Sequence, residues 1–144
     1  MRFYSPKMTF TIHPLDWRDY LPEPACYHIR RYPIRDSGPA RTLFAHSHNF
    51  CEIFLADGDG LWQNLNGTNV ALPRGSLWRL QPGDWHGIFC PDPEHAEGEL
   101  INLALRHETA DCDWPRSGTA RSILLPEAAL QALRLAVAEL EMDV

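Results

Sequence analysis

The sequence predicts an all-β fold, a small barrel or sandwich, for most of its 144 residues. Twelve prolines and nine glycines interrupt the chain at short intervals, as in proteins built from many short strands. One interruption is Asn66-Gly67, a dipeptide whose residues tolerate the positive φ angles of a tight hairpin turn. An apolar content of 44% is enough for one core, so we expect a single barrel domain over residues 1–115.

The expected strands are short runs of branched and aromatic residues that lie between turns made of Pro, Gly, Asn and Asp. Besides Asn66-Gly67, explicit turns occupy residues 57–60, 73–75 and 82–84. The strands that these turns delimit are 8–13, 26–31, 41–48, 51–56, 61–65, 69–72, 77–81, 86–90 and 100–106.

The texture changes after Pro115, and the segment 116–144 is predicted to be a linker followed by one helix. From residue 126 the chain is rich in Ala, Leu and Glu and carries a proline near its first turn, as a helix start allows. The helix has a narrow apolar seam with 3-4-3 spacing. Such a seam either pairs with a second chain, as in a homodimer, or packs on the barrel of the same chain. Its residues are Leu130, Leu133, Val137 and Leu140.

Composition excludes several classes of partner. A net charge of −6 argues against direct binding of DNA or RNA, because nucleic-acid modules usually carry a basic face. No segment has the length of a membrane span, and the first residues do not resemble a signal peptide, so we expect a cytoplasmic protein with no membrane partner. The scattered cysteines indicate free thiols rather than a disulfide framework. They are Cys26, Cys51, Cys90 and Cys112.

A ligand-like pattern runs through residues 44–54, FAHSHNFCEIF, inside an otherwise apolar stretch. Alternate side chains of a strand share one face, so His46, His48 and Glu52 have the same parity and are expected to converge. Two imidazoles and a carboxylate suit a divalent transition metal such as Zn, Ni, Mn or Fe. A hydrogen-bonded histidine without a metal explains a lone H-x-H better, but it does not explain the additional glutamate.

His86 is the fourth expected ligand. It ends the segment GSLWRLQPGDWH, residues 75–86, where a Pro-Gly turn is followed by a short strand that can direct the imidazole into the barrel. We therefore expect a metal site made of His46, His48, Glu52 and His86.

These two segments resemble the two motifs of the cupin superfamily. The first is His46-x-His48-x-x-x-Glu52 followed by Gly58, and the second is residues 75–86, ending Gly83-x-x-His86. The proline of the second motif usually stands one position before the place of Pro82, and this chain has Gln81 there. The resemblance implies a small cupin, a double-stranded β-helix or jelly-roll barrel, with a C-terminal helix.

Within the cupins, residues 46–88 are similar to the N-terminal sensor domain of AraC-type transcription regulators. This resemblance implies a barrel that binds a small-molecule effector such as a sugar, helices that form a homodimer, and DNA binding through a segment that is not in this chain. A sensor would not be an enzyme. The alternative is a stand-alone metal-dependent cupin enzyme, a dioxygenase or an isomerase; no catalytic residue stands out besides the metal ligands.

Aromatic and amide side chains in the predicted barrel are candidate contacts for the effector. Aromatic faces suit the apolar face of a sugar ring, although a tryptophan in a small barrel more often belongs to the core. The candidates are Trp62, Gln63, Trp78, Arg79, Trp85 and Asn102.

Overall fold

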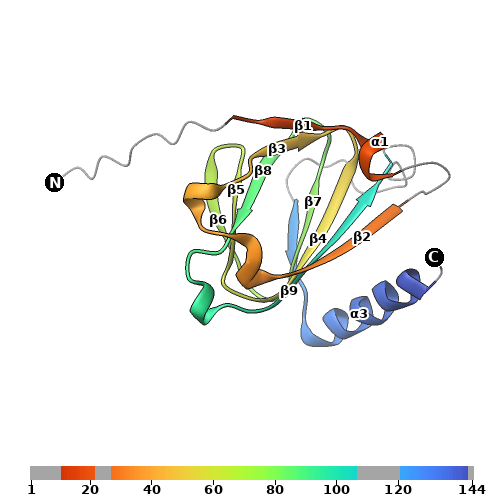
Figure 1. The fold of residues 1–144 in the computed structure, drawn as a ribbon. Helices are drawn as coiled ribbons and strands as arrows, with labels where there is room; N and C mark the ends of the chain where they lie inside the picture. The colour runs from red at the N-terminus through yellow and green to blue at the C-terminus, as the bar shows by residue number, and fades with distance from the viewer. Residues whose placement is uncertain (1–10, 22–26, 107–120, 143–144) are drawn as a thin grey trace.

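Two five-stranded sheets face each other in the computed structural model, which describes residues 11–21, 27–106 and 121–142 (Figure 1). In spatial order, the first sheet contains β1 (His13–Leu15), β3 (His46–His48), β8 (Trp85–Phe89), β5 (Leu61–Leu65) and β6 (Thr68–Leu72). The second contains β10 (Ser122–Leu124), β7 (Ser76–Leu80), β4 (Cys51–Asp59), β9 (Glu97–Leu105) and β2 (Tyr27–Pro33). Short helices lie between strands: α1 (Trp17–Tyr20) and the 3₁₀ helices η1 (Ile34–Ser37), η2 (Ala40–Thr42) and η3 (Pro93–His95).

The order of the strands is that of a jelly roll. Counting β2 to β9 as strands one to eight, one sheet has the order 1-8-3-6 and the other the order 2-7-4-5. This is the double-sheet arrangement that cupins share with capsid and lectin domains. The predicted fold class is therefore confirmed, and the helix α3 (Glu127–Met142) follows the barrel as expected.

Two predicted strands differ from the observed ones. Residues 41–48 do not form one strand, because Thr42 donates from its amide and its hydroxyl to the Pro39 carbonyl and closes η2 instead. The strand is limited to His46–His48. The strand predicted at 8–13 falls largely outside the described residues, and the observed strand β1 begins at His13.

Gly58 lies where β4 and β9 approach each other closely. It is paired with Gly98, and a Cβ atom added to Gly58 would lie 1.9 Å from the Glu97 carbonyl oxygen. The glycine of the first motif thus permits the contact between two central strands of the second sheet.

We expect Gly58→Ala to destabilise the barrel by more than about 3 kcal/mol, because its Cβ meets backbone that cannot move aside cheaply. Urea unfolding measures the loss. The control is Gly83→Ala, at a turn where φ is +94° but no atom lies within 4 Å of the added Cβ. It should lose only about 1–2 kcal/mol through backbone strain. Equal losses would mean that the strands relieve the clash at Gly58 at little cost.

Two of the three hydrophobic clusters among the described residues lie on opposite faces of the second sheet. Inside the barrel, Phe54 packs with buried Leu61 and Leu80. On the outer face, Leu55 and Ile101 pack against the helix α3. Strand alternation explains the division, because neighbouring residues such as Phe54 and Leu55 point to opposite faces.

The helix α3 lies against the outer face of the second sheet (Figure 1). Leu130 and Val137 are buried there with Leu55 and Ile101, and Leu133 packs against the same cluster. The hydroxyl of Tyr27 donates to the Leu140 carbonyl at 2.9 Å, near the end of the helix. The apolar seam therefore packs on the barrel of the same chain, which is the second of the two arrangements that the sequence left open.

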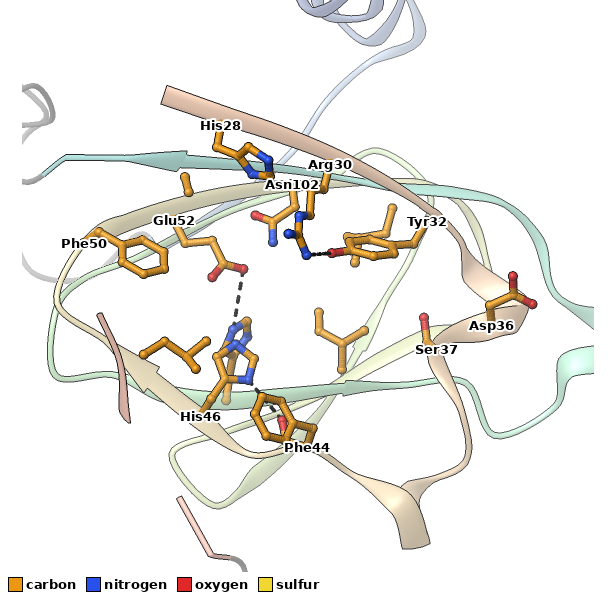
Figure 2. Close-up of a pocket in the computed structure, with 15 residues that line it drawn as sticks. His28, Arg30, Tyr32, Asp36, Ser37, Phe44, His46, Phe50, Glu52 and Asn102 are labelled. Atoms are coloured by element: carbon orange, nitrogen blue, oxygen red, sulfur yellow. Dashed lines mark hydrogen bonds and ion pairs between the residues drawn. The ribbon is translucent and has the colours of Figure 1, made fainter. Parts of the chain in front are cut away.

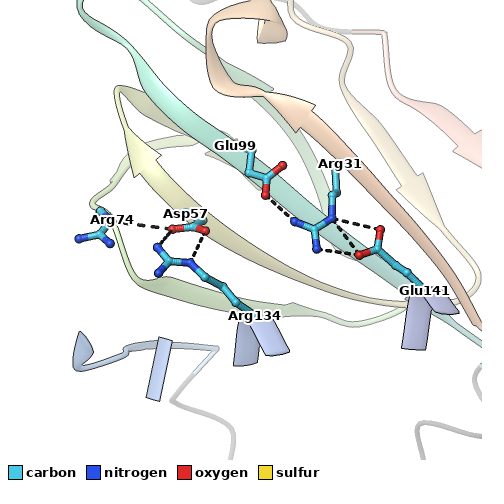
Figure 3. Close-up of polar contacts among 6 residues, drawn as sticks. All are labelled: Arg31, Asp57, Arg74, Glu99, Arg134 and Glu141. Atoms are coloured by element: carbon cyan, nitrogen blue, oxygen red, sulfur yellow. Dashed lines mark hydrogen bonds and ion pairs between the residues drawn. The ribbon is translucent and has the colours of Figure 1, made fainter. Parts of the chain in front are cut away.

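Two groups of ion pairs hold α3 on the sheet (Figure 3). Arg134 binds the Asp57 carboxylate through two nitrogens, with Nε 2.7 Å from Oδ2. Arg31 on β2 pairs with Glu141 of the helix at 2.7 Å and also with Glu99 of β9. The hydrogen bonds from Arg134 hold the pKa of the Asp57 carboxyl below its usual value.

We expect Arg134→Gln to lower the free energy of unfolding at pH 7 by roughly 0.5–1 kcal/mol, the range of a partly exposed ion pair. Because the pKa of Asp57 is lowered in the folded state, its contribution is complete above about pH 4, near its unfolded pKa, and is lost as pH falls through the lower folded value. Urea unfolding of both proteins at pH 7 and pH 3 should therefore show a smaller difference at pH 3 than at pH 7. A difference that is undiminished at pH 3 would assign the effect to packing.

None of the described helices has the length and apolarity needed to cross a membrane. Cys51 and Cys90 are free and buried, as predicted, whereas Cys26 and Cys112 lie outside the described residues. The predicted boundary at residue 115 also falls in a segment outside the described residues, so the division into barrel and linker stays a prediction.

Candidate metal centre

The three histidines of the predicted site come from two adjacent strands of the first sheet. His46 and His48 lie on β3 and share a face because they are two residues apart. His86 on β8 is directly opposite His46 in the antiparallel register. The rings of His46 and His86 are accordingly close, with centroids 4.6 Å apart.

Glu52 reaches these histidines from the other sheet. The chain leaves β3 after His48, turns at Asn49 and Phe50, and enters β4 in the second sheet. Glu52 therefore faces the histidines across the barrel instead of continuing their strand. The predicted convergence is confirmed: the four ligand atoms of His46, His48, Glu52 and His86 lie within 4.8 Å of one another.

A carbonyl oxygen lies beside Nδ1 of each histidine. Nδ1 of His46 is 3.0 Å from the Phe44 carbonyl, and Nδ1 of His48 is 3.1 Å from the Phe50 carbonyl. Nδ1 of His86 is 3.3 Å from Oε1 of Gln63, a fully buried amide. These oxygens only accept, so each neutral imidazole carries its proton on Nδ1 and presents the lone pair of Nε2 to the site.

The Nε2 atoms of His48 and His86 are buried and make no hydrogen bond to any described residue. They nevertheless lie 2.8 Å and 3.5 Å from the two oxygens of Glu52. Lone pairs that face a carboxylate at these distances repel it unless a proton or a metal cation lies between them.

The charges of the site also favour a bound cation. Burial disfavours ionisation of Glu52, but His86 and His48, when their imidazoles are protonated, outweigh it and hold the pKa of this carboxyl well below its usual value. Burial, followed by the neighbouring His86, lowers the pKa of His46 to about 4, so its imidazole is neutral at pH 7. The site therefore combines a carboxylate with at least one neutral imidazole.

The donor set fits a divalent transition metal. Three imidazole nitrogens and one carboxylate oxygen are ligands for borderline ions, and the contacts at Nδ1 are the outer-shell partners that orient metal-binding histidines. A bound ion would also satisfy the two buried Nε2 atoms. We conclude that His46, His48, Glu52 and His86 can hold such a metal.

A cavity of about 400 Å³ opens beside these ligands, between the two sheets (Figure 2). His46, Glu52 and His86 form part of its wall. Apolar residues such as Phe44 and Phe50 form much of the remaining wall, and polar side chains come from β2 and from Asn102 of β9. Its volume is in the range of small-molecule sites.

Of the six predicted effector contacts, Asn102 lines this cavity and the other five do not. Gln63 is behind His86 and orients it. Trp78 stacks with Phe54 in the core at 6.4 Å, and Arg79 is at a separate small hollow on the outer face of its sheet.

The remaining two tryptophans also lie away from the cavity. Trp62 is 37% exposed and contacts Phe89, its neighbour on β8. Trp85 lies next to the β5–β6 turn, where its amide binds the side chain of Asn66. The aromatic platform that would favour a sugar ring is therefore not provided by these tryptophans.

Sequence reasoning missed the polar residues that β2 contributes to the cavity wall, His28, Arg30 and Tyr32. They alternate along β2 and all face the cavity (Figure 2). Polar residues at every second position of a predicted strand could have indicated a shared polar face. This strand lies outside the two motifs on which the site prediction was based.

The sequence matches no profile of a known protein family and no curated protein. Solved structures are similar in fold. A cupin protein from Bacteroides fragilis is 18% identical, with a TM-score of 0.46 over 65% of this chain and 75% of its own. An RmlC-like cupin from Shewanella frigidimarina is 16% identical, with a TM-score of 0.44 over 59% and 70%. Salicylate 1,2-dioxygenase from Pseudoaminobacter salicylatoxidans, in adducts with gentisate, is 22% identical, with a TM-score of 0.41 over 54% of this chain.

Two of these structures are cupins by name. The match spans 20% of the dioxygenase, and only 40% of another similar structure, apo-HppE.

Proposed function

We propose that this chain is a cupin domain that binds a divalent transition metal, Zn, Ni, Mn or Fe, and a small molecule beside it. The observation that carries the proposal is the set of buried Nε2 atoms directed at Glu52, each imidazole held by an oxygen at Nδ1. Because this centre adjoins a cavity, a small molecule bound there would lie next to such an ion.

We further propose that the domain senses an effector, a sugar or sugar derivative, as part of an AraC-type transcription regulator in the cytoplasm. DNA would be bound by a segment outside this chain. The support is the sequence resemblance over residues 46–88 together with the position of α3. Strands β2, β4 and β9 carry cavity residues on one face, and their other face contacts the helix.

Strand β2 connects the cavity to the helix α3 through two consecutive residues. Arg30 faces the cavity, while the next residue, Arg31, binds Glu141 of the helix. A ligand that displaces β2 would therefore also change the attachment of α3. Sensing requires only that the ligand bind one of two arrangements better than the other.

A homodimer is part of the proposal, with one correction to its surface. Leu130 and Val137 are buried against the chain's own sheet and Leu133 packs on the same cluster, so pairing through them requires α3 to leave the sheet. Leu140 is only partly covered. Sedimentation over a range of concentrations measures pairing, and a monomer throughout would remove this part of the proposal.

The alternative is a metal-dependent enzyme, a dioxygenase or an isomerase. Its support is that the candidate metal ligands His46, Glu52 and His86 themselves line the cavity, where a substrate would lie within reach of the ion.

We expect a bound effector to raise the melting temperature only when metal is present. Ligand at a hundredfold its dissociation constant adds about 2.7 kcal/mol of stability. The probe is a thermal-shift screen of mono- and disaccharides and their acids, run with and without added Mn²⁺, Ni²⁺ or Zn²⁺. Each hit is then incubated with the protein and checked for product. Multiple turnover that disappears in Glu52→Gln would overturn the sensor in favour of the enzyme.

A further inference from the structure

The cavity wall opposite the histidines is built by two neighbouring strands. His28, Arg30 and Tyr32 alternate along β2 and therefore share one face. Asn102 on β9 is the direct partner of Arg30 in the antiparallel register. Arg30 and Asn102 thus lie side by side on the same wall, facing the space in front of Glu52 and His46 (Figure 2).

Arg30 gives this wall a fixed positive charge. Among the described residues that line the cavity it is the only lysine or arginine. Burial and the neighbouring Arg30 lower the pKa of His28, which disfavours a positive charge on its imidazole. Of the two acidic lining residues, Glu52 faces the histidines, and Asp36 lies at the other end of the cavity (Figure 2).

The cavity wall offers hydrogen-bond donors at one place and an acceptor at another. Nη1 of Arg30 is 3.4 Å from the Tyr32 hydroxyl, which accepts from it and can donate its own proton onward. A guanidinium beside a hydroxyl donor suits a carboxylate, which only accepts. Oδ1 of Asn102 is buried without a hydrogen bond from any described residue, so it calls for a donor such as a ligand hydroxyl.

We propose that the molecule in this cavity is a small hydroxylated carboxylic acid, such as a sugar acid. Its carboxylate binds Arg30 and the Tyr32 hydroxyl, and one of its hydroxyl groups donates to Oδ1 of Asn102. The carbon body lies against Phe44, Phe50 and the other apolar residues of the wall. This inference rests on the proposed small-molecule site and names the class of its ligand.

The test compares two acids with neutral partners of the same shape by isothermal titration calorimetry. The pairs are glucuronate with glucose, and mandelate with 1-phenylethane-1,2-diol. They are titrated into metal-loaded and metal-free wild type, into Arg30→Gln and Arg30→Lys, and into Arg35→Gln as a control. Arg35 is an exposed arginine of η1 that does not line the cavity.

We expect at least one acid to bind wild type at least tenfold more tightly than its neutral partner. Arg30→Gln should abolish this preference, Arg30→Lys should restore part of it, and Arg35→Gln should leave it intact. Binding of Zn²⁺ alone should be the same in all four proteins, which also shows that the variants fold. The inference is overturned if neither acid is preferred, or if the preference survives Arg30→Gln. Failure of the metal site is a separate result, seen as absent Zn²⁺ binding in wild type.

Discussion

Replacing His48 by alanine is expected to weaken binding of a divalent transition metal by more than 100-fold. Removing only the outer-shell partner of a metal-bound histidine costs roughly 10- to 100-fold, and loss of the ligand itself should exceed this range. His48 is buried and its Nε2 faces Glu52 at 2.8 Å, so the remaining ligands cannot replace it. Isothermal titration of the metal-free protein with Zn²⁺ measures the affinity.

The matched control is His95→Ala. This histidine is 81% exposed and pairs with Asp92 on the surface, away from the site. Circular dichroism of the metal-free proteins shows whether each variant is folded, and Glu52→Gln gives an independent loss of a ligand with little change of shape. If folded His48→Ala and Glu52→Gln both bind Zn²⁺ as wild type does, the ion is held elsewhere and the proposed centre is wrong.

Leu130→Ala is expected to lower the free energy of unfolding by about 2–5 kcal/mol, the range for removing a large apolar side chain from a core. Leu130 is 1% exposed, in the cluster that joins α3 to Leu55 and Ile101 of the second sheet. The loss should be seen as a lower midpoint in urea unfolding.

Leu135→Ala is the control on the same helix. Its side chain is 70% exposed, so the change should stay within about 0.5 kcal/mol, as for most surface substitutions. Equal losses at Leu130 and Leu135 would contradict the packing of α3 on its own barrel, and a loss at Leu135 that depends on protein concentration would indicate pairing of chains instead.

Local signals in the sequence predicted the class of fold well. Turn residues such as Asn66-Gly67 fixed the ends of β5 and β6 to within a residue, because φ angles near these turns allow few other conformations. The start of β3 could not be predicted in this way. There the Thr42 hydroxyl donates to the Pro39 carbonyl and stabilises a local turn. Strand propensity does not take such a hydrogen bond into account.

The candidate metal ligands were predicted on the assumption that His46, His48 and Glu52 share one face of a strand, and this assumption is only partly correct. His46 and His48 do share a face of one strand, whereas Glu52 belongs to the other sheet and meets them across the barrel. That meeting depends on the bend between β3 and β4, which a strand pattern does not contain. The spacing of the cupin motif still predicted the right residues, because it is the spacing that a chain with this bend needs to bring the three side chains together.

Apart from Asn102, the residues of the cavity wall could not be predicted from residue type. Trp62 and Gln63 are adjacent, so they must point to opposite faces of β5, and only the packing of the two sheets decides which face is inside. Gln63 is the inward residue and contacts His86. Arg30 and Asn102 become neighbours through the β2–β9 register, which joins segments about seventy residues apart.

The most direct test of the metal centre is anomalous diffraction from crystals of the protein loaded with Zn²⁺, recorded on both sides of the zinc absorption edge. We expect one anomalous peak bounded by Nε2 of His46, His48 and His86 and by a carboxylate oxygen of Glu52, at about 2.0–2.2 Å from each ligand atom. The same ligands should hold the ion when the cavity contains no small molecule. An empty centre in fully loaded crystals, or a peak held by other residues, would contradict the proposed site.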